Sequence, residues 1–272
     1  MSTVPPPPGD PASGPYGAPQ QQPAPQQPLP QQQGYAQAPV HRPGTDLGAD
    51  LGAALSFAGR SLLRNPAAFL VAGVVYGLLT LIVVGASIAG LVAYMVSAMP
   101  SDPYAEPELG MFVAAYAIMF GILLLLVPIM LLWESGTGRA GELILEGGRP
   151  SIGQALVGPG RIMLTALLMG VIVTIGTFLL YLPGLVASIA FFYAIPAAAR
   201  GASPVEALKQ SVRLVRANLG TTIVAWLVLS VISSAASALI ITVIVLIPFT
   251  ILFQLGMFER LSGRELPDLR SA

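Results

Sequence analysis

Five arginines stand close to the long apolar stretches of this sequence, and their type and spacing suit them to bind phosphate. Arg60, Arg161 and Arg213 each end the same Ala-Leu-x-x-x-x-Arg spacing, and Arg64 and Arg216 follow shortly after two of them. A guanidinium group donates paired hydrogen bonds to phosphate oxygens, so the five predict contacts to lipid phosphates at headgroup depth. The alternative interpretation is that they fix the topology and extend toward water, as basic residues of inner loops commonly do.

Groups that could do catalytic chemistry are sparse. The chain has no cysteine and a single histidine, His41, which excludes disulfides, thiolate metal sites, the usual histidine zinc sites and catalytic triads. None of the long apolar stretches contains Asp, Glu, Lys, Arg or His, so none supplies one of these side chains as a general base at membrane depth. We therefore expect no enzyme, no cofactor and no metal.

Two groups of acids need separate interpretations. Glu134 follows an apolar stretch, where it could be a proton site. An interfacial helix end, with Arg139 close enough to pair, is the alternative that we favour. A separate cytoplasmic helix is predicted to follow Glu134 and to end at Gly147-Gly148. Asp102, Glu106 and Glu108 alternate with prolines and lack the regular spacing of cation ligands, so they indicate a solvated loop.

Composition places the chain in a class. Its 272 residues include 13 Lys+Arg and 13 Asp+Glu, and charged residues make up 10% of the sequence, whereas about 25% is usual in soluble domains. Apolar residues make up 54%, so there is too little polar surface to cover a water-soluble domain. The chain is predicted to be a polytopic membrane protein, and its zero net charge gives no reason to expect nucleic acid.

The first 45 residues differ in character from the rest. They contain 13 of the 25 prolines and nine glutamines, so they have too little apolar surface to offset chain entropy. Residues 1–45 are predicted to be a disordered cytoplasmic tail with polyproline II character. The tail is not a signal peptide, and it acts either as a spacer or as a docking segment for an envelope protein partner.

Six membrane crossings are predicted from four uncharged stretches, at residues 65–101, 109–133, 162–199 and 217–258. A helix crosses the hydrocarbon core in about 20 residues. The third and fourth stretches must therefore fold back, at Pro183-Gly184 and near Ser233 and Ser237, whereas the first is read as one long helix. The expected fold is an all-α transmembrane bundle over residues 46–262, followed by a short cytoplasmic C-terminal tail at 263–272.

The charge of the loops decides how many times the chain crosses the membrane and on which side its termini lie. With six crossings and the N-terminus inside, all 13 basic residues fall on the inner side, and the outer loop carries acids alone. Splitting the first stretch into two helices would put most arginines outside. The positive-inside rule therefore predicts that both termini are cytoplasmic in a multi-pass protein of the cell membrane.

A threefold internal repeat organises the bundle into three hairpins, each preceded by an amphipathic interface helix. The copies align on Ala54, Ala155 and Ala207, with Gly158-Pro159-Gly160 shortening the second. Further agreements are N-cap types at Asp50, Ser151 and Ser203, capping-box residues at Gln154 and Glu206, and Asn65 with Asn218. The second membrane helix of each pair also carries one proline in its inner half or middle, at Pro128, Pro196 and Pro248. The third copy is the clearest amphipathic helix.

The motif Ser-Pro-x-Glu-Ala-Leu-x-x-Ser at residues 203–211, followed by Arg213, Arg216, Asn218 and a membrane hairpin, resembles a group of bacterial six-helix membrane proteins. The group includes the YciC-like proteins and the membrane domain fused to some glycerophosphodiester phosphodiesterases. The resemblance covers about residues 48–262 and implies the six-helix fold. It carries over no catalytic residue, because the hydrolase domain of the fused members is absent. The Pro/Gln tail is similar to those of actinobacterial proline-rich membrane proteins.

Polar groups inside the expected bilayer are uncharged, and three prolines should kink their helices and free backbone carbonyls. The uncharged groups include Thr174, Thr177, Ser188, Thr242, Thr250 and Gln254. We expect a non-enzymatic membrane protein that associates with lipids or acts as a scaffold in the cell envelope. The alternative is a permease or translocator for an apolar or zwitterionic solute or a lipid, in which the kinks and hydroxyls supply the route. The oligomeric state stays open.

Overall fold

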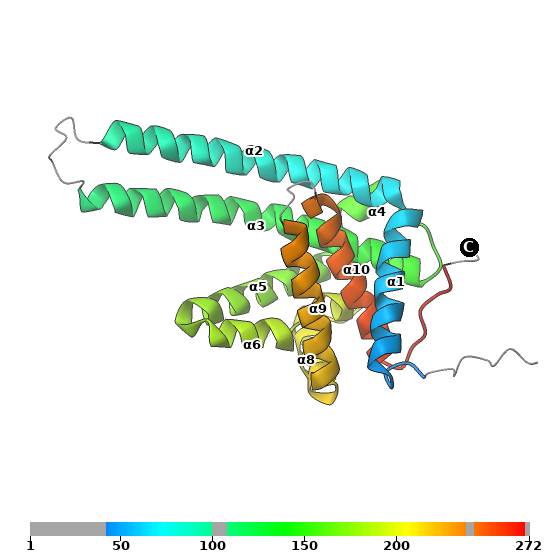
Figure 1. Cartoon of the computed structure of the whole chain (residues 1–272). Helices are drawn as coiled ribbons and strands as arrows, with labels where there is room; N and C mark the ends of the chain where they lie inside the picture. Colours follow the sequence, from blue (N-terminus) through cyan, green and yellow to red (C-terminus); the bar gives the residue numbers. More distant parts are fainter. Residues whose placement is uncertain (1–41, 100–107, 238–241, 270–272) are drawn as a thin grey trace, which may run out of the picture. The chain divides into compact units, whose positions relative to one another are not determined.

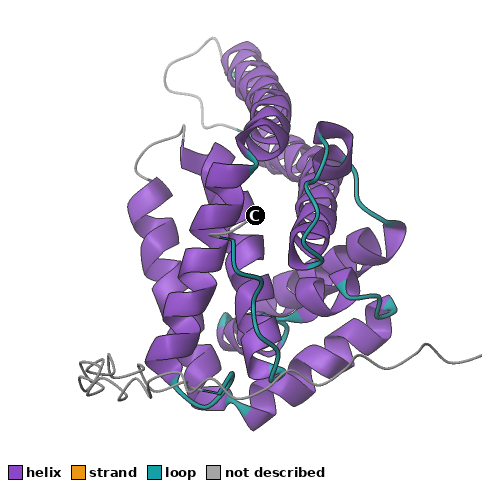
Figure 2. Cartoon of the chain, turned by 90° about the vertical axis from the view of Figure 1, so that its right-hand side faces the viewer, coloured by secondary structure: helices purple, strands orange, loops and turns teal. Residues whose placement is uncertain are grey.

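The computed structural model describes residues 42–99, 108–237 and 242–269. Within these residues every regular element is a helix, which confirms the all-α fold class (Figure 2). The expectations for residues 1–41, for the loop carboxylates Asp102 and Glu106, and for the last three residues lie outside the described part of the chain.

Six stretches are long and apolar enough to cross a membrane, as expected from the sequence. They are α2 (Pro66–Ala98), α3 (Leu109–Leu145), α4 (Ile152–Leu156) with α5 (Gly160–Leu180), α6 (Leu182–Ala190) with α7 (Ala194–Ala199), α9 (Leu219–Ser237) and α10 (Val243–Leu261). The remaining helices are α1 (Leu47–Arg64) and α8 (Pro204–Ala217). The first uncharged stretch is a single helix, which confirms the choice of six crossings over seven.

Helix α10 forms the centre of the packing. It contacts α1, α2, α3, α7 and α9, and nearly all of its second half is buried, including Leu252, Phe253, Leu255 and Met257. Helices α2 and α3 lie side by side along much of their length, and α5 lies beside α6 (Figure 1). Outside this core the spanning helices expose large apolar side chains, such as Ile82 and Leu125, as expected for surfaces that face lipid.

Helix α3 is longer than the predicted crossing. It was expected to stop near Trp133 and to be followed by a separate helix, but one helix runs from Leu109 to Leu145. Gly147 ends it as predicted, with a φ of 80°, and the N–H groups of Gly147 and Gly148 donate to the carbonyls of Ile144 and Leu143. These two bonds form a Schellman motif, which satisfies the last carbonyls of the helix.

The turn between α5 and α6 depends on two glycines in contact. The chain reverses at Tyr181, which has a φ of 62°, and Pro183 occupies the first turn of α6. A Cβ on Gly184 would lie 2.1 Å from Thr177 Oγ1, and one on Gly176 would lie 2.8 Å from the backbone nitrogen of Gly184. The expected break at Pro183-Gly184 is therefore a helical hairpin whose backbones touch, which only glycine permits.

The second helix of this hairpin is broken between α6 and α7. Phe191 and Tyr193 leave the helical conformation, which places the break just before Pro196. The freed groups are satisfied by Ser211 of α8, whose buried hydroxyl donates to Ala190 O at 2.8 Å and accepts from Tyr193 N at 3.0 Å. One side chain thus closes the break and attaches α8 to the bundle.

Replacing Ser211 with alanine should destabilise the protein by about 2–4 kcal/mol, because two buried backbone groups would each lose their partner. Thermal unfolding in detergent should show a clearly lower midpoint. Ser203→Ala is the matched control, since the Ser203 side chain caps nothing and is exposed. Equal midpoints for the two variants would contradict the role given to Ser211.

Helix caps correct one prediction and confirm another. Asp46, not Asp50, is the N-cap of α1, and its carboxylate accepts from Ala49 N. Asp50 lies inside the helix because its carboxylate binds Arg260. The capping box of Ser151 and Gln154 at α4 is present as predicted.

The third N-cap residue, Ser203, lies where it was predicted, but the predicted capping hydrogen bonds are not formed. Ser203 is the N-cap residue of α8, but its side chain caps nothing, and Glu206 binds Arg213 instead of completing a capping box. Asn65 and Asn218 do correspond. Each ends its interface helix with similar backbone angles and donates from its side chain to the carbonyl four residues earlier.

The aligned alanines of the predicted repeat share one environment. Ala54, Ala155 and Ala207 are all fully buried, on α1, α4 and α8. The second interface helix has only five residues, in keeping with Gly158-Pro159-Gly160. The threefold repeat itself stays a prediction.

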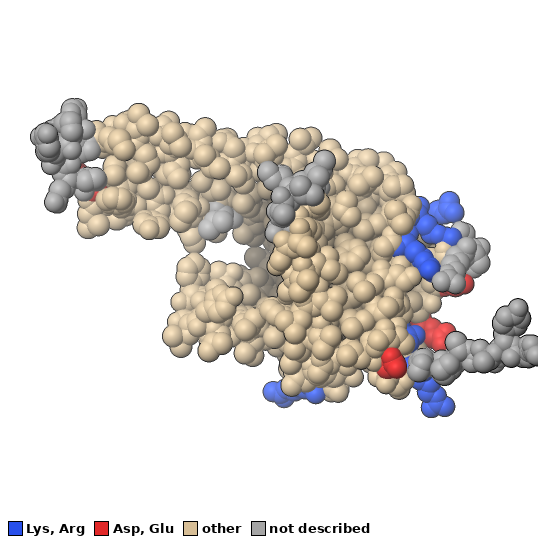
Figure 3. Space-filling view, in the orientation of Figure 1, with Lys and Arg blue, Asp and Glu red and all other residues tan. Residues whose placement is uncertain are grey.

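Basic residues gather at one end of the helices, which we call the charged end. It comprises α1, the last part of α3, the start of α5, α8, the turn before α8 and the end of α10. On the face shown in Figure 3, the lysine and arginine side chains lie at this end, far from the other end of α2. The described lysines and arginines there are Arg42 just before α1, Arg149 just after α3, and Arg60, Arg64, Arg139, Arg161, Arg200, Lys209, Arg213, Arg216, Arg260 and Arg264.

Candidate functional site at the charged end

A buried ion pair joins α1 to α10. Arg260 Nε donates to Asp50 Oδ1 at 2.7 Å, and the two side chains are 10% and 1% exposed. The same carboxylate oxygen accepts from Gly44 N at 3.1 Å. The pair is therefore enclosed and hydrogen-bonded, as a buried charge must be to be tolerated.

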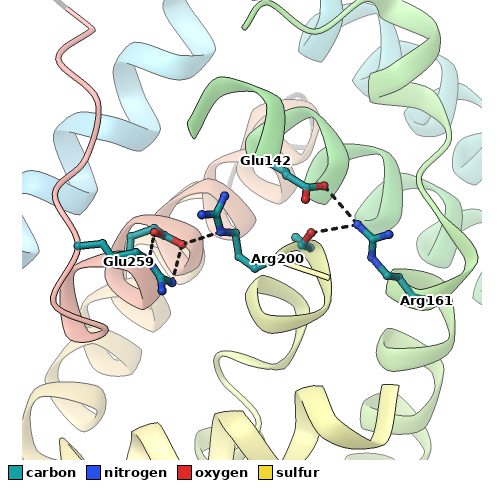
Figure 4. A network of polar contacts seen from close by, with 6 residues as sticks. Glu142, Arg161, Arg200 and Glu259 are labelled. Atoms are coloured by element: carbon teal, nitrogen blue, oxygen red, sulfur yellow. Dashed lines mark hydrogen bonds and ion pairs between the residues drawn. The ribbon is translucent and has the colours of Figure 1, made fainter. Parts of the chain in front are cut away.

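A second network surrounds Glu259 at the end of α10 (Figure 4). Its carboxylate, 4% exposed, lies 3.3 Å from Arg200 Nε and also accepts from Arg264. Gly263 has a φ of 76°, which turns the chain so that Arg264 can fold back. The guanidinium of Arg264 also lies over the Phe258 ring, 5.5 Å from its centroid.

Arg161 closes the end of α7. Its Nε donates to Ala198 O at 2.9 Å and its Nη2 to Ala199 O at 3.2 Å, while Glu142 Oε2 lies 3.5 Å from the same Nη2 (Figure 4). Ala198 O also accepts from Gly201 N at 3.1 Å. The arginine adds side-chain donors to the last carbonyls of a helix that stops there. The side chain remains 38% exposed.

Arg213 lines a groove between α8 and the end of α10. The groove has a volume of about 370 Å³. Its walls carry two guanidinium groups, an amide and a hydroxyl beside apolar surface. The lining residues are Gln210, Arg213, Leu214, Ala217, Phe258, Ser262 and Arg264.

The groove combines donors for an anion with a surface for apolar groups. Arg213 donates to Glu206 at 2.6 Å, but its side chain is 69% exposed, so other donors of its guanidinium stay accessible. Arg264 is 45% exposed and shares Glu259 with Arg200. Arg213 and Arg264 thus line the groove as partly exposed cations, each paired with a glutamate that does not line it. Such a site suits a phosphate that carries an acyl chain.

The five predicted arginines do not meet in one place. Arg60 lines a different groove, of about 330 Å³, between α1 and the segment Leu266–Leu269. Arg64 and Arg216 are exposed in the last turns of α1 and α8. Of the predicted set, Arg213 alone lies in the groove beside α10.

Sequence reasoning missed the groove's other polar residues. Arg264 and Ser262 flank Gly263 directly after α10, and a glycine after a long apolar helix is a usual signal for a chain that folds back. Gln210 lies three residues before Arg213 on α8, on the same helix face. These signals were present, but the proximity of α8 to α10 was not readable from them.

Three of the predicted intramembrane polar residues do meet. Thr174, Ser188 and Gln254 line a cavity of about 390 Å³ between α5, α6, α9 and α10. Of the other groups, Thr177 donates to its own helix at Val173 O, and Thr242 and Thr250 lie on or just before α10, outside this cavity.

Glu134 is not at a helix end. It lies inside α3, which continues to Leu145, and Gly136 two residues later lies against Ala155 and Leu156 of α4. Arg139, expected to pair with it, donates instead to Val157 O at 3.3 Å. In the described part of the chain no three His, Asp or Glu side chains come close enough to hold a metal ion.

Comparisons with known proteins point to relatives without a stated function. Residues 145–266, from the end of α3 through the groove, match the family model of a domain of unknown function, DUF7847. The uncharacterized protein Rv2560 of Mycobacterium tuberculosis is 26% identical over 234 residues, covering 81% of this chain and 71% of that protein. The uncharacterized protein Mb2590 of Mycobacterium bovis matches to the same extent. No solved structure matches the chain significantly. The chain is thus similar to mycobacterial proteins over most of its length.

Proposed function

We propose that this is a non-enzymatic integral membrane protein that binds an anionic phospholipid in the groove between α8 and α10. The observation that carries the proposal is the pairing of Arg213 and Arg264 across one groove beside the apolar side chains of Leu214 and Phe258. The arginines would bind the headgroup phosphate, and the apolar side would receive the start of an acyl chain.

The proposal includes an orientation. The charged end would face the cytoplasm, with both termini on that side, because the positive-inside rule favours it. In that orientation the groove opens at the leaflet that is rich in anionic lipids, to which each basic residue adds roughly 1 kcal/mol of attraction. The proline-rich tail would then act as a cytoplasmic tether for an envelope partner.

Replacing Arg213 with glutamine tests the groove. Phosphatidylglycerol bound to the purified protein would be measured by native mass spectrometry, with phosphatidylcholine as the neutral comparison. We expect phosphatidylglycerol affinity to fall by roughly tenfold or more, since a hydrogen bond to a charged group contributes about 1.5–3 kcal/mol.

Lys209→Gln is the matched control, because Lys209 is an exposed cation on the same helix that does not line the groove. Its loss should weaken binding by no more than about fivefold, through general attraction alone. If Lys209→Gln and Arg213→Gln have equal effects, the groove is not a site. The further contacts predicted for Arg60, Arg64, Arg161 and Arg216 can be tested by the same substitution.

A second candidate function is supported by the cavity in which Thr174, Ser188 and Gln254 meet. It is a permease or translocator for an apolar or zwitterionic solute or a lipid. Flux into proteoliposomes that is abolished by changing Pro196 or Pro248 would favour it over lipid association. The resemblance to YciC-like proteins and to phosphodiesterase membrane domains is likewise a proposal. It implies a six-helix fold, but it implies no activity for this chain.

A further inference from the structure

The cavity between α5, α6, α9 and α10 has the composition of a ligand site. It lies well within the spanning helices, between Met169 of α5 and Leu229 of α9. Its volume of about 390 Å³ is near the lower end of the range of about 300–1,000 Å³ that is usual for ligand pockets. Six polar side chains line it: Thr174, Ser188, Trp226, Ser230, Ser233 and Gln254.

Most of these side chains have hydrogen-bond donors or acceptors that no other part of the described protein uses. Ser188 and Ser230 donate to their own helices, at Leu185 O and Trp226 O, and keep their hydroxyl oxygens as acceptors. The side chains of Thr174, Ser233, Gln254 and Trp226 make no hydrogen bond to any described residue. Thr174 is exposed and the other three are half-buried, so these groups stay open to whatever fills the cavity, and the hydrocarbon core supplies no water to bond to them. A ligand with polar groups in the cavity would give these side chains their hydrogen-bond partners.

The rest of the lining defines the kind of ligand. No charged side chain lines the cavity, so an ionised phosphate would have no counter-charge there. Apolar walls, including Met169, Val173, Phe191 and Phe192, favour an aliphatic body. The walls are membrane-spanning helices, so the bilayer is the nearest source of such a molecule.

We propose that this cavity binds the hydroxyl-bearing head of an uncharged lipid of the diacylglycerol type. The free hydroxyl and the ester carbonyls would bond to the Gln254 amide, the Trp226 indole N–H and the serine and threonine hydroxyls. The acyl chains would leave along the apolar wall. The site is separate from the phosphate groove and depends neither on it nor on transport, so either proposal can fail alone.

Tryptophan fluorescence provides the test, because the chain has two tryptophans and only Trp226 lines the cavity. In a Trp133→Phe variant in nanodiscs, diacylglycerol with brominated acyl chains should quench Trp226 saturably at a low mole fraction. Unlabelled diacylglycerol should relieve the quenching. Phosphatidylglycerol and glycerol should not, because the first is charged and the second has no aliphatic body.

Substitutions locate the binding. Gln254→Leu and Ser233→Ala should each raise the diacylglycerol concentration for half-maximal quenching by roughly fivefold, the effect of one lost hydrogen bond. Thr250→Val, an isosteric change on the same helix as Gln254 but outside the cavity, should leave it unchanged. A Trp226→Phe variant that retains Trp133 should show only the linear quenching given by brominated phosphatidylcholine.

Three results would overturn the proposal. One is quenching of Trp226 that stays linear in brominated diacylglycerol. Another is relief by phosphatidylglycerol or glycerol as effective as relief by diacylglycerol, which would assign the cavity to a phospholipid or to a soluble polyol. The third is unchanged affinity in both Gln254→Leu and Ser233→Ala, which would show that the polar lining does not recognise the ligand.

Discussion

Replacing Arg260 with leucine should lower the free energy of unfolding by about 3–5 kcal/mol, because Asp50 would remain buried without its counter-charge. Asp50 is 1% exposed and could not regain water without opening the contact between α1 and α10. Unfolding by sodium dodecyl sulfate in mixed micelles, followed by circular dichroism, measures the change directly.

Two comparison variants distinguish the cost of leaving a buried charge unpaired from the cost of losing an ion pair. Arg213→Leu removes an ion pair of similar length, 2.6 Å, whose side chains are 69% and 41% exposed, and it should cost about 1 kcal/mol or less. The double variant Asp50→Leu/Arg260→Leu should be more stable than Arg260→Leu alone, since no buried charge is left unpaired. A single variant as stable as the wild type would show that the pair is open to water.

The second large effect is expected from Gly158→Ala. A Cβ on Gly158 would lie 1.9 Å from Ser135 O, and one on the facing Gly136 would lie 2.1 Å from Ala155 O. Neither backbone can move without separating α3 from α4, so the cost should be about 3 kcal/mol or more. The separation would also break the bonds from Gly158 N to Ser135 Oγ and from Tyr76 OH to Leu156 O.

Gly153→Ala is the control for this substitution, because a Cβ there meets nothing within 4 Å and α4 should accept alanine. Trp133 is stacked on Tyr76, with ring centroids 5.8 Å apart, so in a Trp226→Phe background its emission reports on this region during thermal unfolding. If both alanine variants unfold at the same temperature, the α3–α4 contact is looser than described.

The sequence alone was sufficient for the number and type of spanning helices. Uncharged length and loop charge are strong signals, because a bilayer admits few alternatives. Local signals also worked where the whole motif is contiguous. The box of Ser151 and Gln154 and the stop at Gly147 both depend on neighbours within a few residues.

Predictions failed where a distant partner decides the local structure. Asp50 has the residue type of an N-cap, but Arg260, 210 positions away, binds its carboxylate inside the helix. Helix α3 passes through Ser135 and Gly136 because α4 packs against them, and nothing before residue 150 indicates that helix. Glu206 likewise binds Arg213 where a capping box was expected.

The candidate site was predictable only in part. The type of ligand group, arginine for phosphate, followed from composition and spacing, and Arg213 does line a groove with a second arginine. The choice of Arg264 as its companion depends on the fold-back at Gly263 and on the approach of α8 to α10. Proximity of this kind is a property of tertiary packing and has no local sequence signature.

The unequal lengths of the spanning helices have a consequence for the surrounding bilayer. Helix α2 has 33 residues without a charge and is about 50 Å long at 1.5 Å per residue, whereas the hydrocarbon core is about 30 Å thick. The stretch Leu182–Ala199 has 18 residues, or about 27 Å. Helix α2 can match the core only by tilting steeply or by thickening the lipid around it, while the shorter stretch favours a thinner annulus. One molecule would therefore impose a gradient of membrane thickness around its own perimeter.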